Sequence, residues 1–64
     1  MLKTYTLYLC TDDDGRLDFE HAMVDSTQEL VARAHELLER RPGFHSVNVC
    51  FGDEEMFSVR KPGS

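Results

Sequence analysis

A single helical segment in the middle of the chain, with alternating segments on both sides, is the feature that most constrains the fold. Ser26 and Glu29 form a capping box at its expected start, and Pro42 ends it. The residues that share one stripe of this helix are Leu30, Val31, Ala34, Leu37, Leu38 and Arg41. One apolar stripe can cover one face of one sheet, so the flanking segments are expected to form a single layer.

Four segments alternate between polar and apolar residues, as half-buried strands do. They comprise residues 3–10, 16–24, 44–51 and 55–60. Turn residues from Asp12 to Gly15 separate the first two and predict a hairpin, and residues 52–54 separate the last two. If the third strand pairs with the first, the sheet is antiparallel throughout, in the order 2-1-3-4. The expected fold is therefore α+β, with a single domain over residues 1–61 and a flexible tail over residues 62–64.

The apolar side of each strand is expected to pack against the helix. The expected core comprises Tyr5, Leu7, Leu9, Leu17, Phe19, Met23, Leu30, Val31, Ala34, Leu37, Leu38, Val47, Val49, Phe51, Phe57 and Val59. The other side of the sheet is expected to face solvent, with Tyr8 as its central aromatic residue and with Asp18 and Glu20 at its margin. By the same alternation, His21 and His45 fall on the core side of their strands.

The balance of charge limits the classes of partner. Twelve Asp and Glu residues against seven Lys and Arg residues give a formal net charge of -5. Direct binding of a nucleic acid needs a basic surface that neutralises phosphates, so no nucleic-acid partner is expected. An acidic surface keeps a small chain soluble or attracts a basic protein.

Hydropathy and cysteine usage indicate the compartment. No apolar run approaches the roughly 18 residues that a membrane helix needs, and the N-terminal residues alternate, unlike a signal peptide. Cys10 and Cys50 are too few for a disulfide scaffold. They also stand at ends of two strands expected to run antiparallel, which is too far apart for a disulfide bond. We therefore expect two free thiols, no membrane contact and a cytoplasmic location.

The acidic stretch from Thr11 to Glu20 has the composition of a calcium loop but not its spacing. An EF-hand loop has glycine at position 6 and glutamate at position 12, and counting from Gly15 puts Cys10 at position 1 and His21 at position 12. Zinc-ligand spacings such as C-x2-C are also absent from the sequence. No nucleophile with a base and an oxyanion donor can be assembled either. We expect no metal, no cofactor and no enzymatic activity.

Three stretches carry a resemblance to known proteins: residues 5–8 (YTLY), residues 25–38, and residues 47–59 around Gly52. Together they resemble small uncharacterised bacterial proteins, common in alphaproteobacteria, with a hairpin, an acidic-capped helix and a closing hairpin. The resemblance implies the same β-β-α-β-β fold and no assigned activity. The first half is also similar to the N-terminal part of HicB-type antitoxins, although their proline-glycine-cysteine segment after the second strand is missing here.

Two classes of function fit these features. The first is a small acidic interaction module that binds a protein partner, with self-association as a homodimer left open. The second is a phage-type inhibitor, such as an anti-CRISPR or another nucleic-acid mimic, that blocks a basic groove. Rows of carboxylates at phosphate-like spacing would favour the mimic, and the short edge strands could accept a partner strand. The residues expected at a partner surface are Tyr8, Asp12, Asp13, Asp14, Asp18, Glu20, Asp53 and Glu54.

Overall fold

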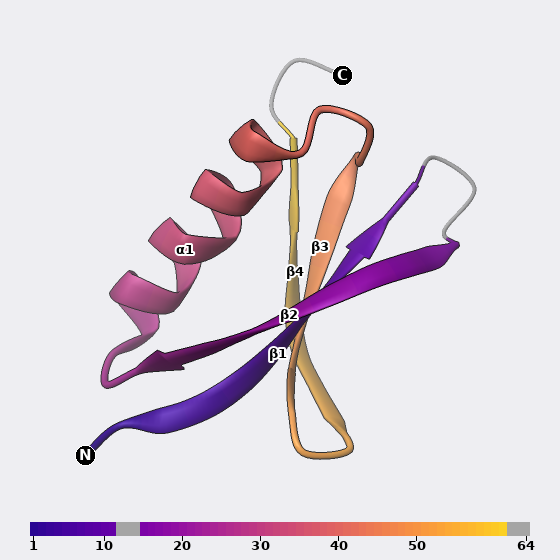
Figure 1. Ribbon diagram of the computed structural model, residues 1–64. Coiled ribbons are helices and arrows are strands. Elements are labelled where there is room, and N and C mark those ends of the chain that lie inside the picture. Colours follow the sequence, from indigo (N-terminus) through magenta and orange to yellow (C-terminus); the bar gives the residue numbers. More distant parts are fainter. Residues whose placement is uncertain (12–14, 62–64) are drawn as a thin grey trace.

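The computed structural model describes residues 1–11 and 15–61 and has the expected order of elements (Figure 1). The elements are β1 (Lys3–Cys10), β2 (Arg16–Val24), α1 (Thr27–Arg40), β3 (Ser46–Phe51) and β4 (Glu54–Arg60). All three strand pairs are antiparallel, and the sheet has the order β2-β1-β3-β4. The predicted α+β fold and strand order are therefore confirmed. The expected tail over residues 62–64 lies outside the described residues.

The helix begins and ends where its capping residues predict. The Ser26 hydroxyl accepts a hydrogen bond from the backbone N–H of Glu29 at 3.2 Å, and the Arg41 N–H donates to the Leu37 carbonyl at 3.1 Å. The buried residues of α1 are Leu30, Ala34, Leu37 and Leu38, as predicted, whereas Val31 and Arg41, also expected on this stripe, are only partly buried. α1 is the one helix among the described residues, and neither its 14 residues nor its composition would let it cross a bilayer.

The core lies between α1 and the two central strands. Leu7 and Leu9 of β1 and Val47 and Val49 of β3 are fully buried, because these strands have a neighbour on each side and the helix above them. Val24 is also buried, although the sequence did not place it in the core. The long connection through α1 brings β3 beside β1, so the centre of the sheet is built from segments far apart in the chain (Figure 1).

The predicted orientation of β2 is wrong. Leu17, Phe19 and Met23 were expected in the core, but their side chains are 71%, 52% and 61% exposed. Leu9 pairs with Asp18 and not with Leu17, because Leu17 is an extra, bulged residue of β2. Opposite residues of a ladder share a face, so this one-residue shift turns every later side chain of β2 to the other side.

Three further residues differ from the expected core. Phe51 is 44% exposed, lying beside the Tyr5 ring at the end of β3, with the Lys3 ammonium 5.7 Å from its ring centre. Cys10 and Cys50 are buried although they alternate with the core residues of their strands. Both are free thiols, and the ladder puts Cys10 opposite Ser46, four positions from Cys50. At about 3.3 Å per residue, that separates the cysteines by roughly 13 Å.

A second bulge occurs in β4. Val49 pairs with Phe57 and Cys50 pairs with Glu55, so Met56 is the extra residue. Met56 is 51% exposed, whereas its neighbour Phe57 packs against the core. The two bulges place Arg16 and Glu55 on the side of the sheet that the helix does not cover, which we call the open face.

Candidate functional site

The open face carries a cluster of ring side chains. Tyr8 of β1 lies directly opposite Phe19 of β2, and their ring centres are 6.0 Å apart. The His21 ring meets the Phe19 ring edge-on at 5.5 Å. Ring pairs at such distances prefer tilted or edge-to-face geometry, as found here. The cluster is therefore an ordered, semi-exposed platform across β1 and β2.

The Arg16 side chain lies over this platform and reaches from β2 to β4 across the open face. The Arg16 guanidinium lies 4.8 Å from the centre of the Tyr8 ring and forms an ion pair with Glu55 of β4 at 3.1 Å. Both ion-pair partners are about half exposed, so the pair itself adds little stability. The pair sets a carboxylate beside the Arg16 charge on the open face, where Arg60 also lies, opposite Ser46.

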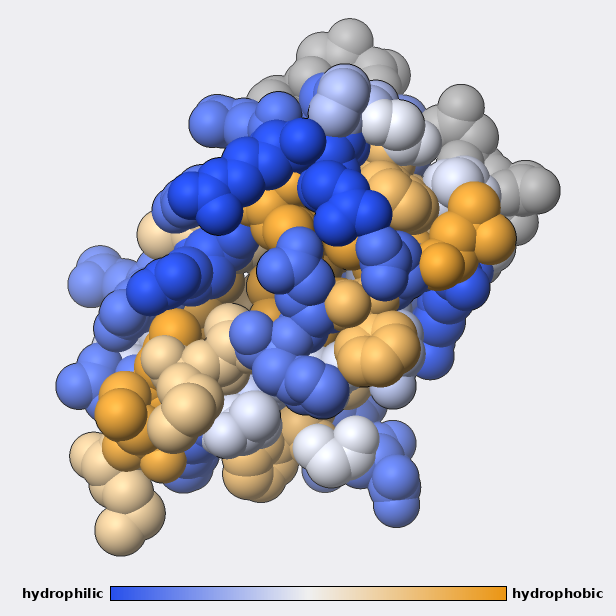
Figure 2. Space-filling model, in the orientation of Figure 1, coloured by the Kyte–Doolittle hydropathy of each residue, from blue (hydrophilic) through white to orange (hydrophobic). Residues whose placement is uncertain are grey.

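The same face presents the large apolar side chains of Phe19 and Met23 of β2, and the bulged Leu17 of the same strand is also exposed. We call Leu17, Phe19 and Met23 the β2 apolar row. Full burial of one such side chain is worth about 1.5–3 kcal/mol, and each is more than half exposed here. Figure 2 shows hydrophobic atoms at the right of the view, where β2 begins, and hydrophilic atoms over the helix at the upper left. Apolar residues grouped on one exposed strand are typical of an interaction surface.

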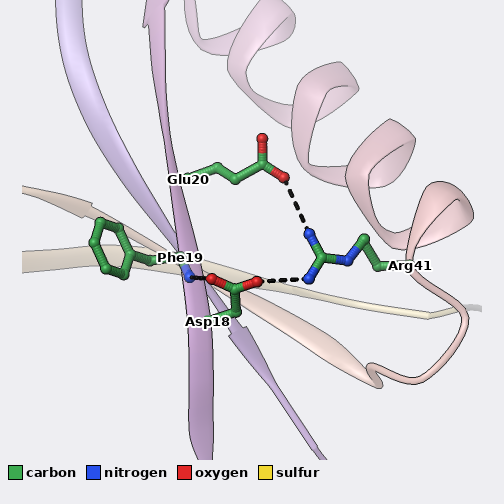
Figure 3. Close-up of polar contacts among 4 residues, drawn as sticks. All are labelled: Asp18, Phe19, Glu20 and Arg41. Carbon is green, nitrogen blue, oxygen red and sulfur yellow. Dashed lines mark hydrogen bonds and ion pairs between the residues drawn. The ribbon is translucent and has the colours of Figure 1, made fainter.

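The opposite side of β2 carries two carboxylates that share one arginine (Figure 3). Arg41, at the end of α1, donates a hydrogen bond to Asp18 at 2.5 Å and forms a second ion pair with Glu20 at 3.6 Å. Its guanidinium also lies 5.4 Å from the centre of the Phe44 ring. In the figure both carboxylates point toward Arg41, and the Phe19 ring points away. The Arg41 hydrogen bond, followed by one from the Phe19 amide, lowers the pKa of Asp18 below its ordinary value of 3.8.

A shallow groove separates β2 from α1. Its volume is about 70 Å³, well below the roughly 300 Å³ of small-molecule pockets. The groove is lined by Leu7, Glu20, His21, Ala22, Arg33, Glu36, Leu37 and Arg40. Arg40 pairs with Glu36 at 2.6 Å, so much of the charge along the groove is already matched. The groove suits a single inserted side chain better than a substrate.

The structure distributes the predicted site residues over separate regions. Tyr8 lies on the open face, whereas Asp18 and Glu20 point to the helix side, which corrects their expected place on the solvated face. Asp53 and Glu54 are exposed at the β3–β4 turn, whereas the end of β1 lies at the opposite end of β3, where Cys10 pairs with Ser46. Asp12, Asp13 and Asp14 lie outside the described residues.

Sequence reasoning missed the most distinctive surface residues. The β2 apolar row was assigned to the core because its large apolar side chains alternate with polar residues along the strand. The bulge in the β1–β2 ladder leaves no motif of its own in the sequence. The sequence contains one indication of the correct orientation. Ala22 and Val24 alternate with the β2 apolar row and are themselves apolar, so the opposite side of β2 could also have been the buried one.

Potential metal ligands do not cluster in the part of the chain that the structure describes. Within residues 1–11 and 15–61, no three His, Cys, Asp or Glu side chains come together as potential metal ligands. Arg41 occupies the space between Asp18 and Glu20, so this carboxylate pair is already bound to a cation of the chain itself. No protein-family model, curated protein sequence or solved structure matches this chain.

Proposed function

We propose that this chain is a small, non-enzymatic interaction module that binds a partner protein through β2 and the open face beside it. The β2 apolar row is the observation that carries the proposal. Three large apolar side chains lie exposed on a strand at the edge of the sheet, next to the ordered Tyr8–Phe19–His21 platform. Covering them would release the water that they now order, which favours association.

Charge supports a protein partner over a nucleic acid. Aromatic platforms on sheets can stack single-stranded bases, but such sites also need cations for the phosphates. Here Arg16, the cation over Tyr8, is paired with Glu55, and the chain has a formal net charge of -5. A partner with basic residues fits this balance better.

The distribution of charge along the helix favours an interaction module and not a nucleic-acid mimic. Along α1, Glu29, Glu36 and Glu39 are interspersed with Arg33 and Arg40. Arg40 is paired with Glu36 at 2.6 Å. A mimic needs uninterrupted rows of negative charge, whereas these carboxylates are interspersed with cations of the same chain.

We place the module in the cytoplasm and propose that it acts on a partner other than its own copy. Two buried free cysteines in a chain of this size fit a reducing compartment. Light scattering at micromolar concentration is expected to give the mass of one chain. A mass of two chains would identify a homodimer instead.

Site-specific photo-crosslinking tests the proposal. A photoreactive amino acid is introduced at Phe19 on the open face and, as the matched control, at Glu39 on the exposed side of α1. In a lysate of the source cells, position 19 is expected to give a discrete protein adduct and position 39 none. Equal labelling from both positions would rule out the open face as the binding surface.

A further inference from the structure

β2 has a neighbour on only one side. Its residues from Asp18 to Val24 pair with β1 without interruption, and β2 is the first strand of the sheet order. An edge strand presents a row of backbone N–H and C=O groups that a further strand can pair with. With nine residues, β2 is also the longest strand among the described residues.

The other edge strand is less suited to pairing. β4 has seven residues, begins with Glu54 and Glu55, and is interrupted by the bulge at Met56. Charges and bulges are common means by which edge strands avoid pairing with another strand. The bulge of β2 lies at Leu17, near its start, and leaves the rest of the strand regular.

The two faces of β2 differ in chemistry. Phe19, His21 and Met23 lie on the open face, opposite Tyr8, Thr6 and Thr4 of β1. Asp18 and Glu20 lie on the helix side, where they share the single cation of Arg41. Arg33 lines the groove beside Glu20, and Arg40 is paired there with Glu36, so the charges next to this side of β2 are largely matched. The long-range attraction for a basic segment therefore comes mainly from the formal net charge of -5 of the whole chain, with Asp18 and Glu20 as its partly exposed contacts on β2.

We propose that the outer edge of β2 accepts an extended segment of a partner protein in which apolar and basic residues alternate. This inference rests on the proposed function and specifies the partner. Strand addition supplies backbone hydrogen bonds, and side chains at every second position then meet one face or the other. Apolar residues of the segment would cover Phe19 and Met23, and basic residues would lie opposite Asp18 and Glu20.

A second copy of the chain is a poorer occupant. Each copy has a formal net charge of -5. Antiparallel pairing of two β2 strands centred on Glu20 would set Glu20 opposite its own copy, and like charges directly opposite are destabilising. Pairing centred on His21 avoids that contact, so self-pairing is included among the outcomes of the test.

Peptide binding followed by amide NMR tests the inference. The probe is a capped nine-residue peptide that alternates valine and lysine. Two control peptides are used: one alternates valine and glutamate, and one has the lysines and valines in separate blocks. The alternating lysine peptide is expected to shift the amides of residues 18–24 and to slow their exchange with solvent. Shifts centred on β4 or α1, or equal binding of the block peptide, would overturn the inference.

A matched pair of double variants tests the role of charge. Asp18→Asn with Glu20→Gln is expected to weaken binding of the lysine peptide at least about tenfold, as expected for the loss of two charged cross-strand contacts. Asp53→Asn with Glu39→Gln removes the same charge elsewhere and is expected to change binding less than about twofold. Equal losses in the two variants would mean general charge attraction and would overturn the inference.

Three further comparisons distinguish the possible outcomes. If the Asp18 and Glu20 double variant does not fold, Glu20→Gln alone is compared with Glu39→Gln, and equal affinities of these two variants would overturn the inference. A two-chain mass whose interface maps to β2 would also overturn it, in favour of self-pairing. Crosslinking at Phe19 without peptide addition at β2 would refute only the strand-addition inference, whereas a lack of crosslinking would refute the proposed function.

Discussion

Leu9 and Asp18 lie directly opposite each other in the β1–β2 ladder, so a fully buried leucine and an ion-paired carboxylate share one face of the sheet. The carboxylate is accommodated there because β2 is at the edge and Arg41 reaches it from the end of α1 at 2.5 Å. The same pairing turns Phe19 outward, beside Tyr8. This relationship determines which side of β2 is exposed and leads to three predictions, and a fourth concerns the β3–β4 turn.

Two leucines in neighbouring strands should differ strongly in their effect on stability. Leu9→Ala removes a side chain with no exposed surface and should lower the free energy of unfolding by about 2–5 kcal/mol. Leu17→Ala removes a side chain that is 71% exposed and should change it by less than about 0.5 kcal/mol. Urea unfolding of both variants measures the difference. Equal losses would mean that Leu17 is buried after all.

Deletion of Leu17 should leave the orientation of β2 unchanged. Without the bulged residue, Cys10 still pairs with Arg16 and Leu9 with Asp18, now in an unbroken ladder. Cross-strand NMR contacts between Tyr8 and Phe19 should therefore persist. Contacts between Leu9 and Phe19 instead would show that the hairpin slips by one residue when the bulge is removed.

The Asp18–Arg41 pair should make stability depend on pH. The pKa of Asp18 is lowered in the folded state, first by the Arg41 hydrogen bond, so its ionised form stabilises the fold. This contribution is present above the unfolded-state pKa of about 3.9 and is lost as pH falls through the lower folded-state value. Asp18→Asn should therefore be less stable than the parent at pH 7, and the difference should vanish in strong acid.

Urea unfolding of the Asp18→Asn variant between pH 7 and pH 2 measures this dependence. Asp53→Asn, in the exposed turn after β3, is the control for a general change in charge. A constant difference between Asp18→Asn and the parent chain over the whole range would contradict the role given to ionised Asp18.

A side chain at the glycine of the β3–β4 turn should destabilise the fold. Gly52 has φ of 63°, in the left-handed region, where an L-residue costs about 1–2 kcal/mol. Gly52→Ala should be destabilised by that amount, although no atom lies within 4 Å of the added carbon. Gly43 has the same open surroundings without a positive φ, so Gly43→Ala should be neutral or up to about 1 kcal/mol more stable. Thermal unfolding of the two variants compares them, and equal melting temperatures would contradict the prediction.

Local sequence signals predict the elements of this fold well. The Ser26 hydroxyl caps α1, and the chain leaves the helix just before Pro42. The alternating segments form strands close to the predicted bounds, although β3 starts at Ser46, two residues later than expected. The antiparallel order follows because the connection through α1 brings β3 back beside β1. The elements and their caps depend on residues near one another in the chain, whereas the strand order depends on pairing between distant segments.

The sequence by itself thus determined the elements, their order, the central core of Leu7, Leu9, Val47 and Val49, and the acidic charge. Only the tertiary structure decided which side of β2 faces the helix. Alternation has a period of two residues, so it separates two sides of a strand without saying which one is buried. The bulge at Leu17 and the bond from Arg41 to Asp18 made that choice, and both depend on contacts across the sheet.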